Sequence, residues 1–328
     1  MGARFFLFIL SLTFTLHSQA RIIYVQLNAP GDGSSWERAM PNLQTALGMA
    51  KTDDQVWVAR GVYFPTDNQD RSVSFHLKDG VTLYGSFAGF ETDIEQRNIA
   101  ENYSVLSGEI GNSSKTDNTL NVLYSDCVSI NTIVDGFIIT GGYADGAGLM
   151  GDRSSSGGGM YNFGSSTCTS SGPTIINCRF IDNTARDGGA IYNFADIKGE
   201  CKPVISNCVF QNNTAFLGGG AIFNNANNQG KCITKIADNH FMSNSAGFGG
   251  AVFNLSQNGI CQTIIENSRF AKNKAMIQGG GIFNAGINGN SYTKLNTKCE
   301  FLENMAPKGS AMANIRELST SDKNLVKL

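Results

Sequence analysis

Short apolar runs followed by glycine or asparagine recur at a nearly constant interval through the second half of the chain. A second element, Phe-x-x-Asn, recurs in phase with the first, and both return every 29 to 31 residues. Such a fixed period is typical of repeat architectures, in which each unit stacks on the one before it. The first element, Gly-Gly-Ala-Ile-Tyr-Asn and its variants, ends at Asn162, Asn193, Asn224, Asn254, Asn284 and Asn314.

Several solenoid classes share a period near 30 residues, and the composition of the repeat separates them. Helical repeats need helix-length segments with apolar residues at i, i+3, i+4 and i+7. These repeats instead hold short runs rich in isoleucine, valine and phenylalanine, cut by glycine and asparagine, and they lack the dense leucine pattern of leucine-rich repeats. The pattern therefore predicts an all-β chain wound as a parallel β-helix, with about three short strands per turn.

Equivalent residues of successive coils should stack about 4.8 Å apart, so that each repeated side chain forms a ladder. Asparagine ladders can link their amides from coil to coil and satisfy turn carbonyls, and we interpret them as structural, the alternative being a metal- or sugar-binding row. Two apolar ladders are expected to fill the core: Ile175, Ile205, Ile236 and Ile265, and Phe180, Phe210, Phe241, Phe270 and Phe301.

The less repetitive first half is interpreted as the beginning of the same solenoid. A Ser34-x-x-Glu37 capping box precedes apolar residues at helical spacing, although Pro41 can kink or restart this helix. We expect the helix to cover the open end of the core, where the first coil would expose apolar ladders and unpaired strand edges. The residues expected on its buried face are Trp36, Met40, Leu43, Leu47 and Ala50.

One β-helix domain is predicted over residues 21–328, and residues 1–20 are predicted to be a cleaved export signal. The signal combines Arg4, an apolar run and small residues at the expected cleavage site, the alternatives being a buried strand or a membrane anchor. No later stretch approaches the ~20 apolar residues of a membrane span, so the mature chain should have no transmembrane segment and should be secreted or at the cell surface. Within the domain we expect a cap and irregular coils at 21–145, regular repeats at 146–314 and a tail at 315–328.

Charge and composition narrow the range of partners. The chain has 25 Lys and Arg against 27 Asp and Glu, a net charge of −2 at pH 7. This near-neutral balance gives no electrostatic reason to expect nucleic acid or an anionic bilayer as a partner. The 38 glycines and the low charged fraction of 16% indicate many turns and few solvated helices.

Three of the eight cysteines, Cys201, Cys232 and Cys261, each lie nine residues before a ladder phenylalanine and should stack in adjacent coils. Stacking near 4.8 Å falls within the Cα range of a disulfide, but parallel Cβ vectors fit its dihedral poorly. A Cys201–Cys232 disulfide and a buried thiol ladder are therefore both left open. Without paired Cys-x-x-Cys spacing, a structural zinc site is not expected.

The motifs resemble a known family. The segments GGAIYN, CRFIDNTA, GGAIFN and CVFQNNTA are similar to the repeats of the polymorphic outer membrane proteins, and the resemblance implies a right-handed parallel β-helix of the surface-protein or adhesin class. The segment at 31–65, with DGVTLYGSFAG further on, resembles the N-terminal cap of exported β-helix proteins in the pectate-lyase-like superfamily. The repeats are specific for fold and weak for function, since one scaffold supports many activities.

Enzymes of that superfamily cleave acidic polysaccharides, and the sequence lacks their signature motifs. One column of chemically active residues precedes or flanks the ladder phenylalanines on the expected outer face. In a lyase, Arg269 or Lys272 would abstract the proton next to a uronate carboxylate, His240 would assist, and calcium could take part. The alternative is an ordinary solvated β-face. The catalytic candidates are Arg179, Asp238, His240, Arg269 and Lys272.

An aromatic residue precedes the last asparagine of each Gly-Gly-Ala-Ile-Tyr-Asn element. If the neighbouring aliphatic residue faces inward, these rings form an outward strip that suits stacking against sugar rings. The alternatives are that loops fold over the strip or that the rings face inward. The candidate ligand-binding residues are Tyr161, Tyr192, Phe223, Phe253 and Phe283.

The sequence thus favours an exported, non-catalytic β-helix that acts as an adhesin or glycan-binding scaffold for a polysaccharide or cell-surface component, with no resident cofactor or metal. Two alternatives remain: a lyase or hydrolase of an acidic, uronate-containing polysaccharide, and a purely structural surface spacer.

Overall fold

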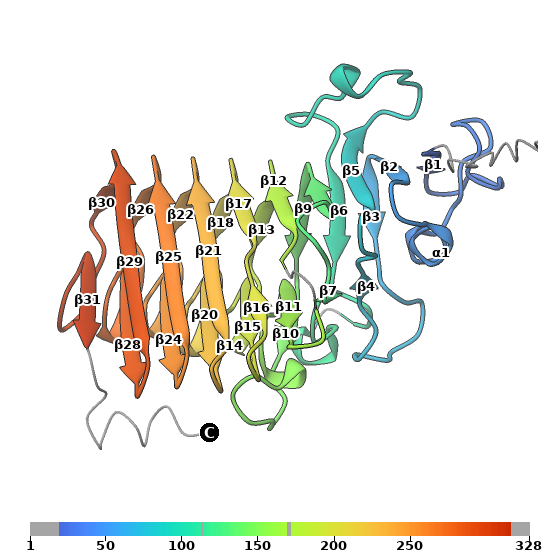
Figure 1. Cartoon of the computed structure of the whole chain (residues 1–328). Coiled ribbons are helices and arrows are strands. Elements are labelled where there is room, and N and C mark those ends of the chain that lie inside the picture. The colour runs from blue at the N-terminus through green and yellow to red at the C-terminus, as the bar shows by residue number, and fades with distance from the viewer. Residues whose placement is uncertain (1–19, 113, 169–171, 316–328) are drawn as a thin grey trace, which may run out of the picture.

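A computed structural model describes residues 20–112, 114–168 and 172–315, and the predicted export signal therefore lies outside the described residues except for Ala20. The chain winds into a parallel β-solenoid of about nine turns, an all-β fold as predicted. Figure 1 shows the coils stacked side by side from the N-terminal helix to the last strand. All of the strand pairs that build its sheets are parallel.

Each regular coil passes through four sheets, A, B, D and C in that order, so the expectation of three strands per turn is one too low. The fourth strand per coil is a short, irregular one that ends at the paired glycines, and register shifts interrupt it. Sheet A contains β1 (Ile22–Val25), β2 (Gln55–Ala59), β5 (Thr82–Phe87), β8 (Ile133–Asp135), β12 (Thr174–Ile176), β16 (Glu200–Cys201), β17 (Val204–Ser206), β21 (Lys231–Ala237), β25 (Ile260–Glu266) and β29 (Asn290–Thr297).

The other three sheets run beside sheet A along the solenoid. Sheet B contains β3 (Gly61–Tyr63), β6 (Ser104–Ser107), β9 (Phe137–Thr140), β13 (Arg179–Ile181), β18 (Val209–Gln211), β22 (His240–Met242), β26 (Arg269–Ala271) and β30 (Glu300–Leu302). Sheet C contains β4 (Phe75–His76), β7 (Leu123–Asp126), β11 (Met160–Gly164), β15 (Ile191–Ala195), β20 (Ile222–Asn227), β24 (Val252–Gln257), β28 (Ile282–Ile287) and β31 (Met312–Ile315). Sheet D contains β10 (Tyr143–Ala144), β14 (Thr184–Asp187), β19 (Thr214–Gly218), β23 (Ser245–Phe248) and β27 (Lys274–Gln278).

The phenylalanine ladder runs along the interior of the tube. Consecutive rings from Phe180 to Phe301 stack with centroids 4.6 to 5.1 Å apart and planes within 8° of parallel. The isoleucine ladder of sheet A is buried in the same cluster. The predicted apolar ladders are confirmed, and their side chains pack against one another in the interior of the regular coils.

The asparagine ladders are buried and structural, as predicted. In sheet C each side-chain amide donates to the carbonyl oxygen of the next asparagine, from Asn162 to Asn314, at 2.6 to 2.8 Å. In the second ladder, Asn244 Nδ2 donates to the Phe210 carbonyl at 2.9 Å, and equivalent residues repeat this bond in other coils. The accepting carbonyls belong to the ladder phenylalanines, so these bonds tie the turn that follows each strand of sheet B to the strand of the preceding coil.

The N-terminal cap is present, but its helix begins later than predicted. The helix α1 spans Leu43–Met49, and its N-cap is Asn42, whose side chain accepts from the Thr45 amide at 2.9 Å. The Ser34–Glu37 box caps no helix, because Met40 is extended and bridges to Val25 before Pro41. Trp36 consequently packs in an outer aromatic cluster, whereas Met40, Leu43 and Leu47 close the core. Short 3₁₀ turns occur at η1 (Ile94–Gln96), η2 (Lys115–Asp117) and η3 (Arg153–Ser155).

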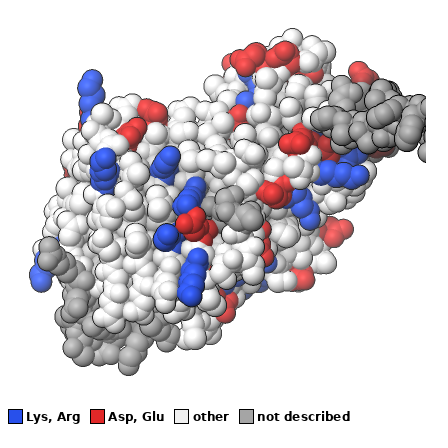
Figure 2. All heavy atoms as spheres, viewed as in Figure 1, with Lys and Arg blue, Asp and Glu red and all other residues white. Residues whose placement is uncertain are grey.

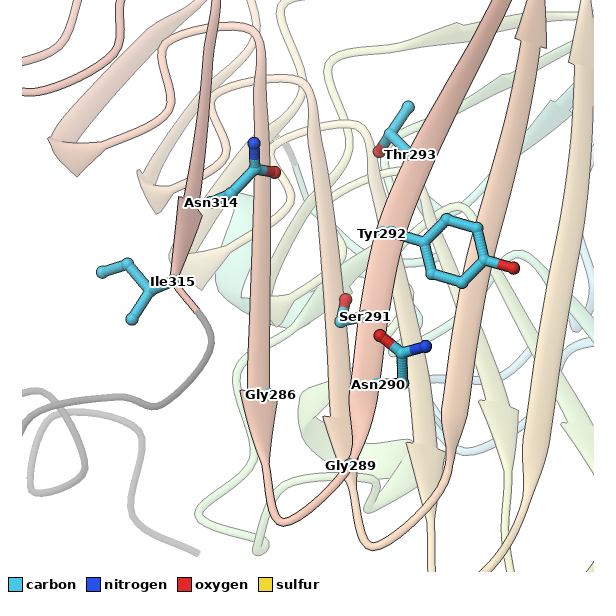
Figure 3. A pocket seen from close by; sticks show the side chains of 8 residues that line it. All are labelled: Gly286, Gly289, Asn290, Ser291, Tyr292, Thr293, Asn314 and Ile315. Atoms are coloured by element: carbon cyan, nitrogen blue, oxygen red, sulfur yellow. The ribbon is translucent and has the colours of Figure 1, made fainter.

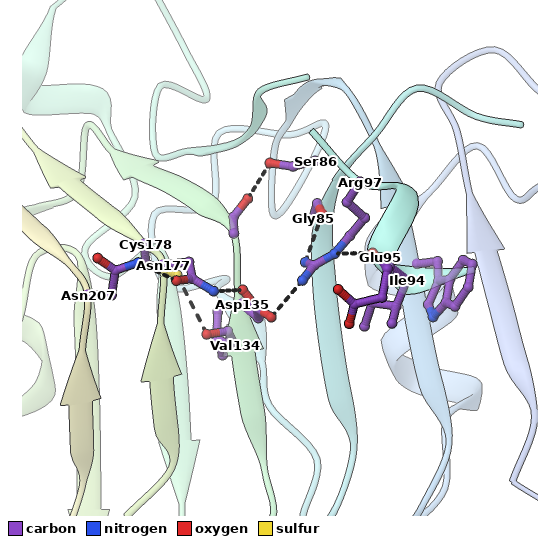
Figure 4. A network of polar contacts seen from close by, with 12 residues as sticks. Gly85, Ser86, Ile94, Glu95, Arg97, Val134, Asp135, Asn177, Cys178 and Asn207 are labelled. Carbon is purple, nitrogen blue, oxygen red and sulfur yellow. Dashed lines mark hydrogen bonds and ion pairs between the residues drawn. The ribbon is translucent and has the colours of Figure 1, made fainter. Parts of the chain in front are cut away.

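A polar network ties the irregular coils to the regular ones at the turn between sheets A and B (Figure 4). Arg97 forms a largely buried ion pair with Asp135 at 2.9 Å. Asn177 donates to Asp135 at 2.7 Å, and Asn207 donates to Asn177 at 2.6 Å. Asn177 and Asn207 have φ values of 55° and 50°, a left-handed conformation that asparagine tolerates better than most residues. The network is therefore a turn ladder along the solenoid.

Among the described residues, the structure forms one disulfide, between Cys127 and Cys168. The sequence did not predict this pair. Cys201, Cys232 and Cys261 do lie in register in adjacent coils and are fully buried, as expected, and they pack with Ala195 and Ala226. The open question about these three is resolved in favour of a buried ladder.

Candidate functional site

Three of the five predicted catalytic residues lie in one row of aligned positions on the outer side of sheet B. Arg179, Val209, His240, Arg269 and Glu300 occupy one register across β13, β18, β22, β26 and β30. His240 and Arg269 are exposed, with Arg269 Nε 3.7 Å from a Glu300 carboxylate oxygen. Arg179 and Arg269 are three coils apart, roughly 14 Å at the strand spacing, which is too far for both to contact one reacting group.

The two remaining catalytic candidates lie on turns at opposite ends of these strands. Asp238 precedes β22 with φ 57° and accepts from Asn267 Nδ2 at 2.5 Å, which makes it a member of the turn ladder. Lys272 follows β26 with φ 57° and lies 3.8 Å from a Glu303 carboxylate oxygen. The structure thus does not bring the five candidates together, and none of them lines the four cavities described in this chain. Their catalytic role remains a prediction from the sequence.

The aromatic row forms as a ladder in sheet C and faces away from the main core, but it is not an exposed strip. Tyr161 is 5% exposed and the other four rings are fully buried in a second apolar cluster. Sheet D covers the row: Phe248 stacks on Phe283 with centroids 5.1 Å apart, and Gly218 lies against the Phe253 ring. The expectation of an accessible sugar-stacking surface here is therefore wrong, because the residues before the paired glycines fold over it.

The outer face of sheet A carries a group of lysines that the repeat pattern does not predict. Figure 2 shows Lys and Arg side chains gathered over this face of the regular coils, with few acidic residues among them. In β21 and β29, alternate residues point outward, so that lysines share the surface with isoleucines and a tyrosine. We call this surface the lysine face; it comprises Lys202, Lys231, Lys235 and Lys294 with Val204, Ile233, Ile260, Ile264 and Tyr292.

Positive charge is only partly compensated on the lysine face. Lys202 Nζ donates a hydrogen bond to the Glu200 carboxylate, whose other oxygen lies 3.8 Å from Lys231 Nζ, so one carboxylate is shared by two lysines. The Lys202 side chain holds the pKa of the Glu200 carboxyl below its usual value, and the group stays ionised near neutral pH. Lys235 and Lys294 occupy one column, two coils apart, and no ion pair among the described residues involves either of them.

The largest of the described cavities lies at the last coil and has a volume of about 700 Å³ (Figure 3). It lies between the turn that joins β28 to β29 and the end of β31. Its lining is small and polar apart from two side chains, and its residues are Gly286, Gly289, Asn290, Ser291, Tyr292, Thr293, Asn314 and Ile315.

Comparison with known proteins agrees with the repeat geometry. The Chlamydia polymorphic membrane protein repeat matches the chain at residues 177–193 and 207–225, which include parts of two adjacent coils. No curated protein and no solved structure matches the chain. None of the helices in the described part of the chain is long and apolar enough to cross a membrane. The chain is a parallel β-helix protein whose repeats are similar to those of the Chlamydia polymorphic membrane proteins, a family of surface-exposed proteins associated with the outer membrane.

Proposed function

We propose that this protein is a non-catalytic adhesive scaffold that binds an acidic glycan of a cell surface or matrix along its lysine face. The observation that supports the proposal most directly is the excess of lysines on the outer face of sheet A, where they outnumber the acidic residues Glu200 and Glu266. The similarity to a surface-exposed repeat family supports it independently. A rigid solenoid presents such a face over several coils without having to close around its ligand.

The arrangement of the lysines suits a repeating polyanion better than a single small anion. Lys235 and Lys294 are separated by two coils, roughly 9.6 Å at the strand spacing. That separation is close to the screening length of physiological salt, so each lysine attracts its own anionic group. Every contact is individually weak, and several of them along one chain add to a usable affinity. Apolar side chains between the lysines add contact area for the sugar rings.

Salt-dependent retention on immobilised heparin tests the proposal. A double variant on the lysine face, K235E and K294E, should elute at much lower salt than the native protein. A matched double variant on β26 and the turn that follows it, R269E and K272E, reverses the same number of exposed cations and should change the elution far less. Equal losses in both variants would refute a role for the lysine face, and absence of retention of the native protein would favour a structural spacer.

A polysaccharide lyase remains the second candidate, supported by the alignment of exposed His240 and Arg269 on sheet B. Its test is separate from glycan retention. Incubation with polygalacturonate, with and without calcium, would give an unsaturated product that absorbs in the ultraviolet. Product that disappears in Arg269→Ala would replace the scaffold by the enzyme.

A further inference from the structure

Sheet D has a small slot on its outer surface, apart from the lysine face. A cavity of about 290 Å³ lies over β19, β23 and β27, and is lined by Thr214, Ala215, Phe216, Ser245, Ala246, Gly247, Lys274 and Met276. Phe216 and Met276 are 63% and 67% exposed and are among the most exposed large apolar side chains of the described residues. They form the two walls, and Gly247 forms the floor between them.

A difference in strand length between coils produces the slot. Ala246 and Phe248 of β23 pair with Ala275 and Gln278 of β27. One residue, Gly247, lies between the first two, whereas two residues lie between their partners. The same shift occurs on the other side, where β19 has one more residue than β23. A side chain cannot fill the gap, because a Cβ on Gly247 would lie 2.6 Å from the Leu217 carbonyl oxygen. Phe216 and Met276 therefore face each other across two coils, roughly 9.6 Å, which leaves room for one ring between them.

The slot is amphipathic in a way that matches a charged sugar. Thr214, Ser245 and Lys274 occupy one register beside it, with the two hydroxyl oxygens 3.4 Å apart. Lys274 is exposed and takes part in none of the ion pairs between described residues. One edge thus offers hydroxyl groups and a cation, and the other offers an aromatic face and a thioether.

We propose that this slot is a subsite for a single hexuronate residue of a glycan. The apolar face of the pyranose ring stacks on Phe216, its hydroxyl groups exchange hydrogen bonds with Thr214 and Ser245, and Lys274 pairs with its carboxylate. An aromatic side chain of a protein partner would use the walls but leave the hydroxyl pair and the cation without a function, and charge complementarity therefore favours the acidic sugar.

Titration calorimetry and saturation-transfer NMR with tri-galacturonate, and with neutral maltotriose as the comparator, test the subsite. Tri-galacturonate should bind and maltotriose should bind much more weakly. Phe216→Ala should weaken binding about tenfold, as expected for loss of one aromatic platform. Lys274→Gln should reduce the preference for the acidic sugar and the salt dependence of its binding.

Two exposed positions outside both the slot and the lysine face provide matched controls, Met242→Ala on sheet B for the apolar wall and Lys51→Gln in the N-terminal cap for the cation, and neither should change tri-galacturonate binding. All four side chains are exposed, so the variants should keep the native circular dichroism. The subsite is refuted if tri-galacturonate does not bind, or if Phe216→Ala and Lys274→Gln bind it as the native protein does. Loss of binding in Lys294→Gln alone would also refute it, by assigning the sugar to the lysine face.

Discussion

Removal of one rung of the inner asparagine ladder should destabilise the solenoid far more than loss of an exposed asparagine. Asn244 Oδ1 accepts from the Asn213 backbone N–H and from Asn213 Nδ2, both at 3.0 Å, and its own amide donates to the Phe210 carbonyl at 2.9 Å. Asn244→Ala leaves that N–H buried without a partner and removes the side-chain bond to that carbonyl. At about 1 to 3 kcal/mol for the orphaned N–H and about 0.5 to 1.5 kcal/mol for the lost bond, the free energy of unfolding should fall by about 1.5 to 4.5 kcal/mol.

Guanidinium unfolding followed by circular dichroism measures this loss, and hydrogen exchange locates it. The control is Asn296→Ala, because Asn296 is exposed and makes one side-chain bond, to Glu266 at 2.6 Å. That variant should lose less than about 0.5 kcal/mol. In Asn244→Ala, faster exchange should centre on the two coils that contain residues 213 and 244, because each coil is stabilised chiefly by its neighbours. Equal midpoints for the two variants would refute the assignment of the ladder as a source of stability.

Three further predictions concern stability. Burial raises the pKa of Asp187 to about 6, against its usual 3.8, despite its Arg186 partner, so the folded protein binds a proton more readily between these values. The free energy of unfolding should therefore fall by about 2 kcal/mol from pH 4 to 6, and pH-dependent melts of Asp187→Asn should lack that slope. Gly218→Ala would place a Cβ 2.1 Å from the Phe253 ring and should cost about 1 to 3 kcal/mol in thermal unfolding, whereas Gly48→Ala, in open space on α1, should stabilise by up to about 1 kcal/mol. Non-reducing peptide mapping should find Cys127 linked to Cys168, and Cys168→Ser should lower the free energy of unfolding by about 4 kcal/mol for a separation of 41 residues; a free Cys168 thiol would contradict this pairing.

The core of the fold could be predicted from sequence because every coil repeats the same inward residues. The phenylalanines and asparagines are spaced by the length of one coil, and spacing alone places them on top of one another. Sheet D was missed because its strands, such as β19 and β23, are short, end in glycine and differ in length by one residue. The start of α1 was missed because Ser34 and Glu37 fit a capping pattern, although the extended residue Met40 and Pro41 delay the helix to Leu43.

The candidate site was harder to predict, because the solvent-facing residues follow no period. A net charge near zero concealed the lysine face, because the net charge sums over the whole chain and carries no information about one face. The signal was present in β21, where Lys231, Ile233 and Lys235 alternate with buried residues and must share one face. The repeat does not predict the disulfide, because Cys127 and Cys168 follow no common phase along the chain.

The inward residues of the regular strands are nearly constant from coil to coil and the outward residues vary, and this difference indicates where function can arise in this protein. In sheet B the inward position is phenylalanine in five consecutive coils, while its outward neighbour changes from arginine to valine, histidine, arginine and glutamate. The inward residue is fixed by stacking, and the outward one is free to vary without loss of the fold. Binding sites are therefore expected where the outer surface departs from the repeat, at the lysines of sheet A and at the missing residue beside Gly247.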